Sequence, residues 1–127
     1  MICGVGIDLV ENRRMEKIIE KWGGKFLSRI FSDEEMGYCG KHAHPVPHYS
    51  ARFAAKESFL KALGIGLGMG VKLSDISVAN DQNGKPFLHL SGEAKSYIQE
   101  REITQVHLSL THTNHYASAI VLLENKN

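Results

Sequence analysis

The stretch ARFAAKESFLKALGIG (residues 51–66) combines a helical apolar pattern with several charged side chains. At about 100° per residue, its alanine, leucine and phenylalanine side chains cover most of a helix circumference, which is typical of a buried helix. The charged residues that interrupt this surface are Arg52, Lys56, Glu57 and Lys61. Because an unpaired charge is costly in a protein core, these side chains need partners.

The segments around this helix predict an α+β fold with a mainly antiparallel sheet. Alternating apolar residues indicate strands at 2–10 and 105–112, and a more uniformly apolar run indicates a central strand at 116–124. A further hairpin is predicted around Asn83-Gly84, a pair that favours a type I′ turn. The order is one strand, several helices, two strands, one helix and two strands, and this irregular order is typical of an α+β protein.

Local signals predict where the helices begin. Asn12 is the expected N-cap of an amphipathic helix that ends at Gly23, and SDEE (residues 32–35) is a capping box. Ser91 is the expected cap of a helix near the C-terminus. The segment KHAHPVPHYS (residues 41–50) reads as a loop because it contains two prolines.

Length and composition favour a single soluble domain over residues 1–127. The formal net charge is +1 and 43% of residues are apolar, so no overall charge points to nucleic acid. No run of about 18 apolar residues predicts a membrane span. The first residues do not resemble a signal peptide, and the two cysteines are outside any CxxC pair, so we expect a cytoplasmic protein with reduced thiols.

Two carboxylates are candidates for a metal site. Glu57 lies on the apolar side of its helix, with Lys61 one turn later, in an orientation that favours an ion pair. Asp8 follows Gly4 and Gly6 on one face of the first strand, where glycines indicate that a ligand or another backbone approaches closely. Two carboxylates with open water positions suit Mg²⁺. The alternatives are a structural ion pair for Glu57 and a turn-capping role for Asp8.

Cationic side chains could surround a phosphate group bound near these carboxylates. Arg52, Lys56 and Lys61 are candidates for this counter-charge, and His112 at the end of a strand could also contact phosphate. His112 could equally be a hydrogen-bonded turn residue. The pattern of His42, His44 and His48 is a weak match to zinc-ligand spacing.

A basic stripe follows one face of the first predicted helix. Arg14, Lys17 and Lys21 recur at helical spacing. A solvated helix face is the simplest interpretation, and an acidic protein partner is the functional one. Nucleic acid is a weaker hypothesis because no aromatic residues alternate with the stripe.

Four segments together resemble the holo-acyl-carrier-protein synthases, the small bacterial type of 4′-phosphopantetheinyl transferase. In chain order they are GVGIDLVE (4–11), RFAAKESFLKALGIG (52–66), NDQNGKPF (80–87) and HLSLTHTNHYASAIVL (107–122). The resemblance covers nearly the whole chain, and residues 36–48 are its weakest part. The first two motifs at their separation are far more specific than either alone.

The resemblance implies an activity. Members of this family transfer 4′-phosphopantetheine from coenzyme A to a serine of apo acyl carrier protein, in support of fatty acid synthesis, and release adenosine 3′,5′-bisphosphate. They use Mg²⁺ and form homotrimers with active sites at subunit interfaces.

The resemblance also implies site residues. Metal ligands would be Asp8 and Glu57, and Glu57 or a metal-bound water would be the base. Coenzyme A would contact Arg52, Lys56, Lys61 and His112, with Lys61 also catalytic. The carrier protein would bind Arg14, Lys17 and Lys21. The competing hypotheses are a non-catalytic module that binds an acidic protein through the stripe, and a different Mg²⁺-nucleotide enzyme, for which we find no signature.

Overall fold

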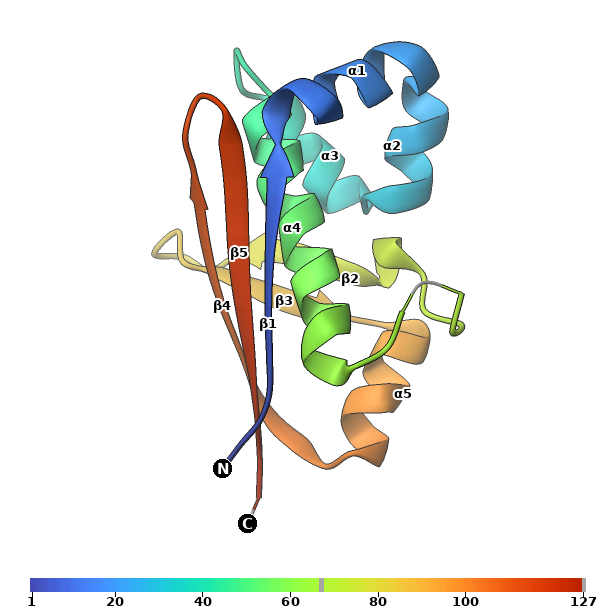
Figure 1. Cartoon of the computed structure of the whole chain (residues 1–127), viewed down its shortest axis with the longest axis vertical. Helices are drawn as coiled ribbons and strands as arrows, with labels where there is room; N and C mark the ends of the chain where they lie inside the picture. The colour runs from blue at the N-terminus through green and yellow to red at the C-terminus, as the bar shows by residue number, and fades with distance from the viewer. Residues whose placement is uncertain (67, 127) are drawn as a thin grey trace.

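The computed structural model describes residues 1–66 and 68–126, and its elements follow the predicted order (Figure 1). The strands are β1 (Ile2–Glu11), β2 (Ile76–Asn80), β3 (Pro86–Leu90), β4 (Ile103–His112) and β5 (Tyr116–Asn125). The helices are α1 (Asn12–Trp22), α2 (Gly24–Ile30), α3 (Asp33–Gly40), α4 (Val46–Leu63) and α5 (Gly92–Glu100), with a 3-10 turn at Leu73–Asp75. The strands pair antiparallel in the orders β1-β5-β4 and β2-β3, which confirms the predicted α+β fold.

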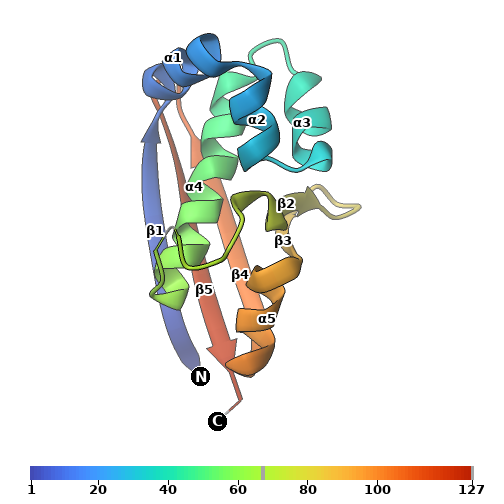
Figure 2. The same cartoon turned by 90° about the vertical axis from the view of Figure 1, so that its right-hand side faces the viewer.

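Helix α4 lies at the centre of the molecule. It runs along one face of the β1-β5-β4 sheet, and the β2-β3 hairpin lies beside it and contacts β4 (Figures 1 and 2). Helices α1, α2 and α3 gather at one end of the molecule and α5 lies toward the other. Phe59, Leu60 and Leu63 of α4 are buried in the main core cluster with residues of β2 and β5, as the apolar pattern predicts.

Two glycines allow α4 to approach β1 at backbone distance. A Cβ atom added at Gly6 would come within 3.0 Å of the Ser58 carbonyl oxygen, and one at Gly4 would come as close to the carbonyl oxygen of Ala62. The close approach predicted for this strand face is therefore confirmed, and the approaching group is the α4 backbone. This contact fixes the position of β1 against α4.

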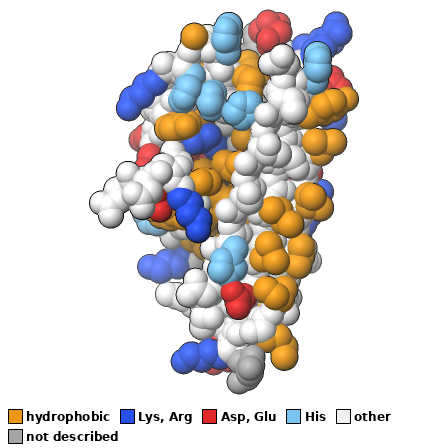
Figure 3. All heavy atoms as spheres, turned by 90° about the vertical axis from the view of Figure 1, so that its left-hand side faces the viewer, with side chains coloured by type: hydrophobic (Ala, Val, Ile, Leu, Met, Phe, Trp, Pro, Cys, Tyr) orange, Lys and Arg blue, Asp and Glu red, His pale blue; other side chains and the backbone are white. Residues whose placement is uncertain are grey.

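The other face of β1 points outward. Val5, Ile7 and Leu9 are 54%, 62% and 64% exposed, and Ile120 and Leu122 of β5 lie beside them in the register. The apolar alternation that identifies β1 as a strand thus marks an exposed surface and not the core. Figure 3 shows exposed hydrophobic side chains along this side of the molecule.

Helix α4 begins five residues earlier than predicted, at Val46, so part of the predicted 41–50 loop is helical. Pro47 lies in the first turn, where a backbone N–H has no helical acceptor and proline is tolerated. The prediction of a loop up to Ser50 was wrong because it treated both prolines as helix breakers.

Two predicted turn and cap assignments were also wrong, and a third was right only for its position. The Asn12 amide donates to the carbonyl oxygens of Thr113 and Asn114 instead of capping α1. Ser91 is the N-cap residue of α5 as predicted, but its hydroxyl donates to Asp75 and makes no capping hydrogen bond. The β2-β3 turn has positive φ at Gly84 but not at the preceding asparagine, so it is not type I′. The capping box at Ser32 is confirmed.

None of the helices in the described residues combines the length and the apolar character needed to cross a membrane. Cys3 and Cys39 are both free thiols.

Candidate active site

Asp8 and Glu57 line the same cavity. Asp8 extends from the glycine face of β1 toward α4, and Glu57 lies on the side of α4 that faces β1 and α1. The cavity has a volume of about 430 Å³, and its walls include Arg14, Phe53 and Tyr116. Two carboxylates that are 49 positions apart in the chain therefore meet because the Gly4 and Gly6 contacts hold β1 against α4.

Like charges in this cavity favour a cation. Burial, and then the negative charge of Asp8, raise the pKa of Glu57, while Lys61 lowers it. Within residues 1–66 and 68–126 there is no cluster of three or more metal-ligating side chains. A pair of carboxylates nevertheless suits Mg²⁺, which needs few protein ligands and completes its coordination with water and phosphate oxygens.

Lys61 is partnered and still accessible. Its ammonium group donates to Asp8 Oδ1 at 2.9 Å and to the Ile7 carbonyl oxygen at 3.0 Å, and 54% of its side chain is exposed. The i, i+4 pair with Glu57 predicted from the sequence is replaced by a pair with Asp8. Lys61 is thus an accessible cation that contacts Asp8 and acts on the charge of Glu57, although it does not line the cavity itself.

Arg52, which is buried, and His112 lie in another part of the molecule. Arg52 is five residues before Glu57 on α4, which places the two side chains about 140° apart around the helix axis. The Arg52 guanidinium lies 4.0 Å from the centre of the Tyr38 ring, and the His112 ring lies 5.3 Å from that of His48. Neither residue lines the cavity of Asp8 and Glu57, so the chain does not bring all the predicted residues together in one cavity.

Lys56 lies in the protein interior, with no exposed surface. Its ammonium group donates to Glu35 Oε1 at 2.6 Å and to the carbonyl oxygens of Leu73 and Ile76 at 2.9 and 2.6 Å. All three N–H donors are used, so none is left for a phosphate. The structure therefore argues against coenzyme A binding by Lys56 and gives this residue a structural role.

The basic stripe borders the cavity of Asp8 and Glu57. Arg14, Lys17 and Lys21 are all exposed on α1, and Arg14 also lines that cavity. A partner bound along the stripe would therefore lie next to the two carboxylates.

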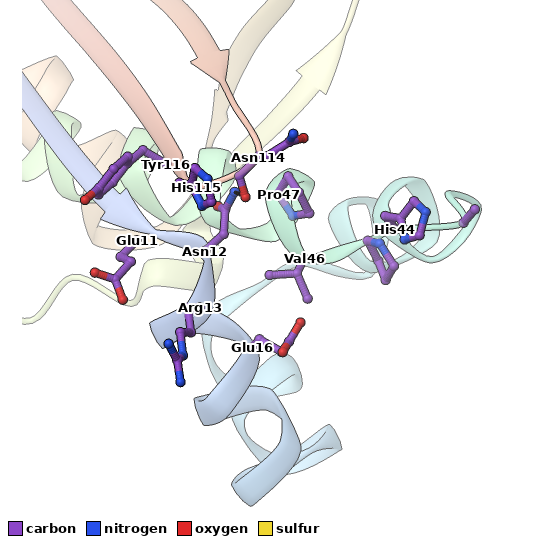
Figure 4. Close-up of a pocket in the computed structure, with 12 residues that line it drawn as sticks. Glu11, Asn12, Arg13, Glu16, His44, Val46, Pro47, Asn114, His115 and Tyr116 are labelled. Atoms are coloured by element: carbon purple, nitrogen blue, oxygen red, sulfur yellow. Dashed lines mark hydrogen bonds between the residues drawn. The ribbon is translucent and has the colours of Figure 1, made fainter.

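A larger groove lies on the neighbouring side of α1. It has a volume of about 820 Å³ and lies between the start of α1, residues 43–47 and the β4-β5 turn (Figure 4). Glu11 and Tyr116 line both this groove and the carboxylate cavity, so the two are adjacent. The groove itself contains neither Asp8 nor Glu57.

Sequence reasoning missed the partner of Lys56. Glu35 was identified only as the last residue of a capping box, where its side chain does accept from the Ser32 backbone N–H. The same carboxylate also binds Lys56 and the backbone N–H of Val78. A glutamate in a capping box is normally exposed, so the sequence carried no signal that this one is buried.

Comparison with known proteins gives consistent matches over nearly the whole chain. A model described as the 4′-phosphopantetheinyl transferase superfamily matches residues 4–121. A holo-[acyl-carrier-protein] synthase of Syntrophus aciditrophicus is 54% identical over 124 residues, which cover 98% of this chain and 97% of that protein.

Solved structures agree with the sequence matches. The crystal structure of holo-[acyl-carrier-protein] synthase from Neisseria meningitidis has a TM-score of 0.91 at 33% identity, covering 98% of this chain and 100% of that chain. A holo-(acyl-carrier-protein) synthase from Bacillus anthracis in complex with CoA (3′,5′-ADP) has a TM-score of 0.82 at 38% identity, covering 99% of both chains.

Proposed function

This chain belongs to the 4′-phosphopantetheinyl transferase superfamily, and from that membership we propose that it transfers 4′-phosphopantetheine from coenzyme A to a serine hydroxyl of apo acyl carrier protein. The resemblance found in the sequence is confirmed. In the reaction the serine oxygen bonds to the β-phosphorus, the pyrophosphate bond breaks, and adenosine 3′,5′-bisphosphate leaves. The observation that carries the proposal is the meeting of Asp8 and Glu57 in one cavity.

Asp8 and Glu57 are the residues that would hold Mg²⁺. When bound, the ion would neutralise negative charge on the pyrophosphate of coenzyme A. Glu57, whose pKa is raised, is the candidate group to accept the serine proton. Lys61 lies beside Asp8 and can move to the departing phosphate, where it would stabilise charge or donate a proton.

Arg52 and His112 would bind phosphate groups of the nucleotide, and we propose that they do so from a neighbouring subunit. Two observations support a homotrimer with active sites at subunit interfaces. Arg52 and His112 lie in a part of the molecule other than the one that holds Asp8. The outward side of β1 also exposes a row of apolar side chains that a second copy could cover.

The carrier protein would dock on the α1 stripe of Arg14, Lys17 and Lys21. Acyl carrier protein is the acidic partner that the stripe fits by charge, and Arg14 reaches the cavity where the serine must arrive. We also propose that residues 1–127 act as one domain in the cytoplasm, where the free thiols of Cys3 and Cys39 stay reduced.

Neutralising either carboxylate should abolish transfer. We expect Asp8→Asn and Glu57→Gln each to lower kcat/KM by roughly 100-fold or more, because the charge stabilisation that a metal supplies amounts to several kcal/mol. The measurement is the mass gain of an apo carrier protein incubated with coenzyme A and Mg²⁺, with and without chelator.

Folding must be separated from chemistry in this experiment. Because burial and Asp8 raise the pKa of Glu57, its charged form is disfavoured in the folded protein, so Glu57→Gln should keep or raise the melting temperature in chelator. Glu100→Gln, an exposed change at the end of α5, is the matched control. Full activity in both carboxylate variants would disprove the site.

Reversing two charges of the stripe should weaken the association of the carrier protein with this chain. We expect Lys17→Glu/Lys21→Glu to raise KM for the carrier roughly tenfold at low salt and to flatten its salt dependence, since the electrostatic attraction is lost. KM for coenzyme A should stay unchanged. Lys85→Glu/Lys95→Glu changes the net charge equally at exposed positions away from α1 and is the control. If both double variants have the same KM for the carrier protein, the stripe is a solvated helix face and does not bind the carrier protein.

A further inference from the structure

Histidine side chains stack where α3, α4 and the end of β4 meet. The ring centres of His42 and His48 are 3.7 Å apart with the planes at 29°, and the His112 ring lies edge-on to His48. His42 Nδ1 lies 3.0 Å from the Tyr38 carbonyl oxygen. Histidine side chains gather near the top of the face shown in Figure 3. His44 is not part of this stack and lines the groove of Figure 4. The three histidines that weakly matched zinc-ligand spacing therefore do not form a metal-ligand cluster in the described residues.

A buried cation lies beside the stack. Arg52 is only 3% exposed, its Nη1 donates to the His48 carbonyl oxygen at 3.4 Å, and its Nε has no hydrogen-bond partner. Among the described residues no carboxylate forms an ion pair with this guanidinium. A buried cation without a counter-charge is costly, so this surface is suited to an anion.

His48 is held in its neutral form when no anion is bound. Burial, followed by the charges of His42, His112 and Arg52, lowers the pKa of His48 to about 4. A dianionic phosphate placed beside the same rings would oppose these effects, since an opposite charge favours the protonated imidazole.

We propose that His42 and His48 belong to the phosphate-binding surface of Arg52 and His112, and that this histidine stack takes up a proton when a nucleotide phosphate binds. The inference rests on the proposed nucleotide role of Arg52 and His112. It adds two binding residues from the segment where family resemblance is weakest, and a dependence of coenzyme A affinity on pH.

The other ionisable groups near the stack leave this balance intact. From α3, Cys39 is buried and its pKa is raised to about 12, so it is a neutral thiol. Deeper in α4, Lys56 is paired with Glu35, and the two charges cancel. The local charge is therefore set by Arg52, the histidines and the phosphate that they contact.

Linkage gives the sign of the effect. If binding raises the pKa of an imidazole, the complex holds more protons than the free protein, so affinity increases as pH falls. A plot of the logarithm of the association constant against pH then falls with a slope equal to the number of protons taken up.

Calorimetry with adenosine 3′,5′-bisphosphate tests the proposal. The nucleotide is titrated into the full chain at pH 6.5 in two buffers of low and high ionisation enthalpy, and the difference in heat gives the protons exchanged. We expect a larger proton uptake for the wild type than for His48→Gln. The free nucleotide, with a phosphate pKa near 6, starts from the same protonation state in both titrations.

Two controls keep the test decisive. His89→Gln, an exposed change on β3, should show the wild-type proton uptake. If His48→Gln does not fold, NMR titration of the wild-type histidine ring protons replaces it, and at least one imidazole pKa should rise when the nucleotide is added.

The possible outcomes distinguish this inference from the proposed function. Equal proton uptake in wild type and His48→Gln, or unchanged imidazole pKa values, would overturn the inference while nucleotide binding stands. Failure of the wild type to bind the nucleotide at all would overturn both.

Discussion

Gly6→Ala is expected to destabilise the protein and to abolish transfer together. The new methyl group would collide with the Ser58 carbonyl oxygen, and backbone cannot move aside as a flexible side chain can. Overpacking typically lowers the free energy of unfolding by about 1–3 kcal/mol. We expect a clash with helix backbone to cost at least the upper value of this range, because the backbone cannot be repacked. Any relief by moving β1 away from α4 also moves Asp8 away from Glu57.

Urea unfolding and the transfer assay measure the two effects. Gly37→Ala is the matched control, because an added Cβ there meets nothing within 4 Å and its site in α3 favours alanine over glycine by roughly 0.5–1 kcal/mol. We expect the control to be slightly stabilised and fully active. A Gly6→Ala protein with wild-type stability would show that β1 does not need its contact with α4.

Substitutions of the two lysines of α4 are expected to have opposite effects on stability and on transfer. Lys56→Met leaves the buried Glu35 carboxylate without its cation, and breaking a buried pair in this way costs about 3–5 kcal/mol. Lys61→Met removes a partly exposed cation, so its effect on the free energy of unfolding should stay below about 1 kcal/mol. Its effect on transfer should be large, because Lys61 contacts Asp8 and acts on the charge of Glu57.

Comparison of the two variants separates structural from chemical roles. Glu35→Gln/Lys56→Met should recover part of the stability lost in Lys56→Met, since the unpaired charge is gone. Any Lys56 variant that remains folded should keep its affinity for coenzyme A. A folded Lys56→Met protein with normal stability but weakened coenzyme A binding would restore the phosphate role that the sequence predicts.

Periodicity and special residues made much of the fold predictable. Alternation identified β1 and β4, and Gly4 and Gly6 indicated a close approach on the face that carries Asp8. The meeting of Asp8 and Glu57 follows from that approach, because α4 is the element that needs burial. What alternation could not show was which face of β1 is covered. The covered face is the glycine face, and Val5 and Ile7 point outward.

Long-range partners were the least predictable part of the site. The sequence led us to expect a metal ion or a ligand as the partner of every charged side chain of α4. For Lys56 the structure gives another partner, Glu35 from α3, and nothing local in either sequence segment encodes that pairing. Arg52 and His112 could be chosen by residue type. The separation of Arg52 from Glu57 depends on which side of α4 each neighbouring element covers, and that of His112 depends on where β4 ends, so neither can be read from a local pattern.

Asn12 joins two surfaces that the proposed reaction uses separately. Its backbone N–H donates to the His115 carbonyl oxygen at 2.8 Å, and its side-chain amide holds the two preceding carbonyls of the β4-β5 turn. The first residue of α1 is thereby fastened to the turn that begins just after His112. In the proposed complex, these three hydrogen bonds would fix the position of the carrier-docking helix relative to the end of β4 that carries His112, and so the spacing between the two substrates.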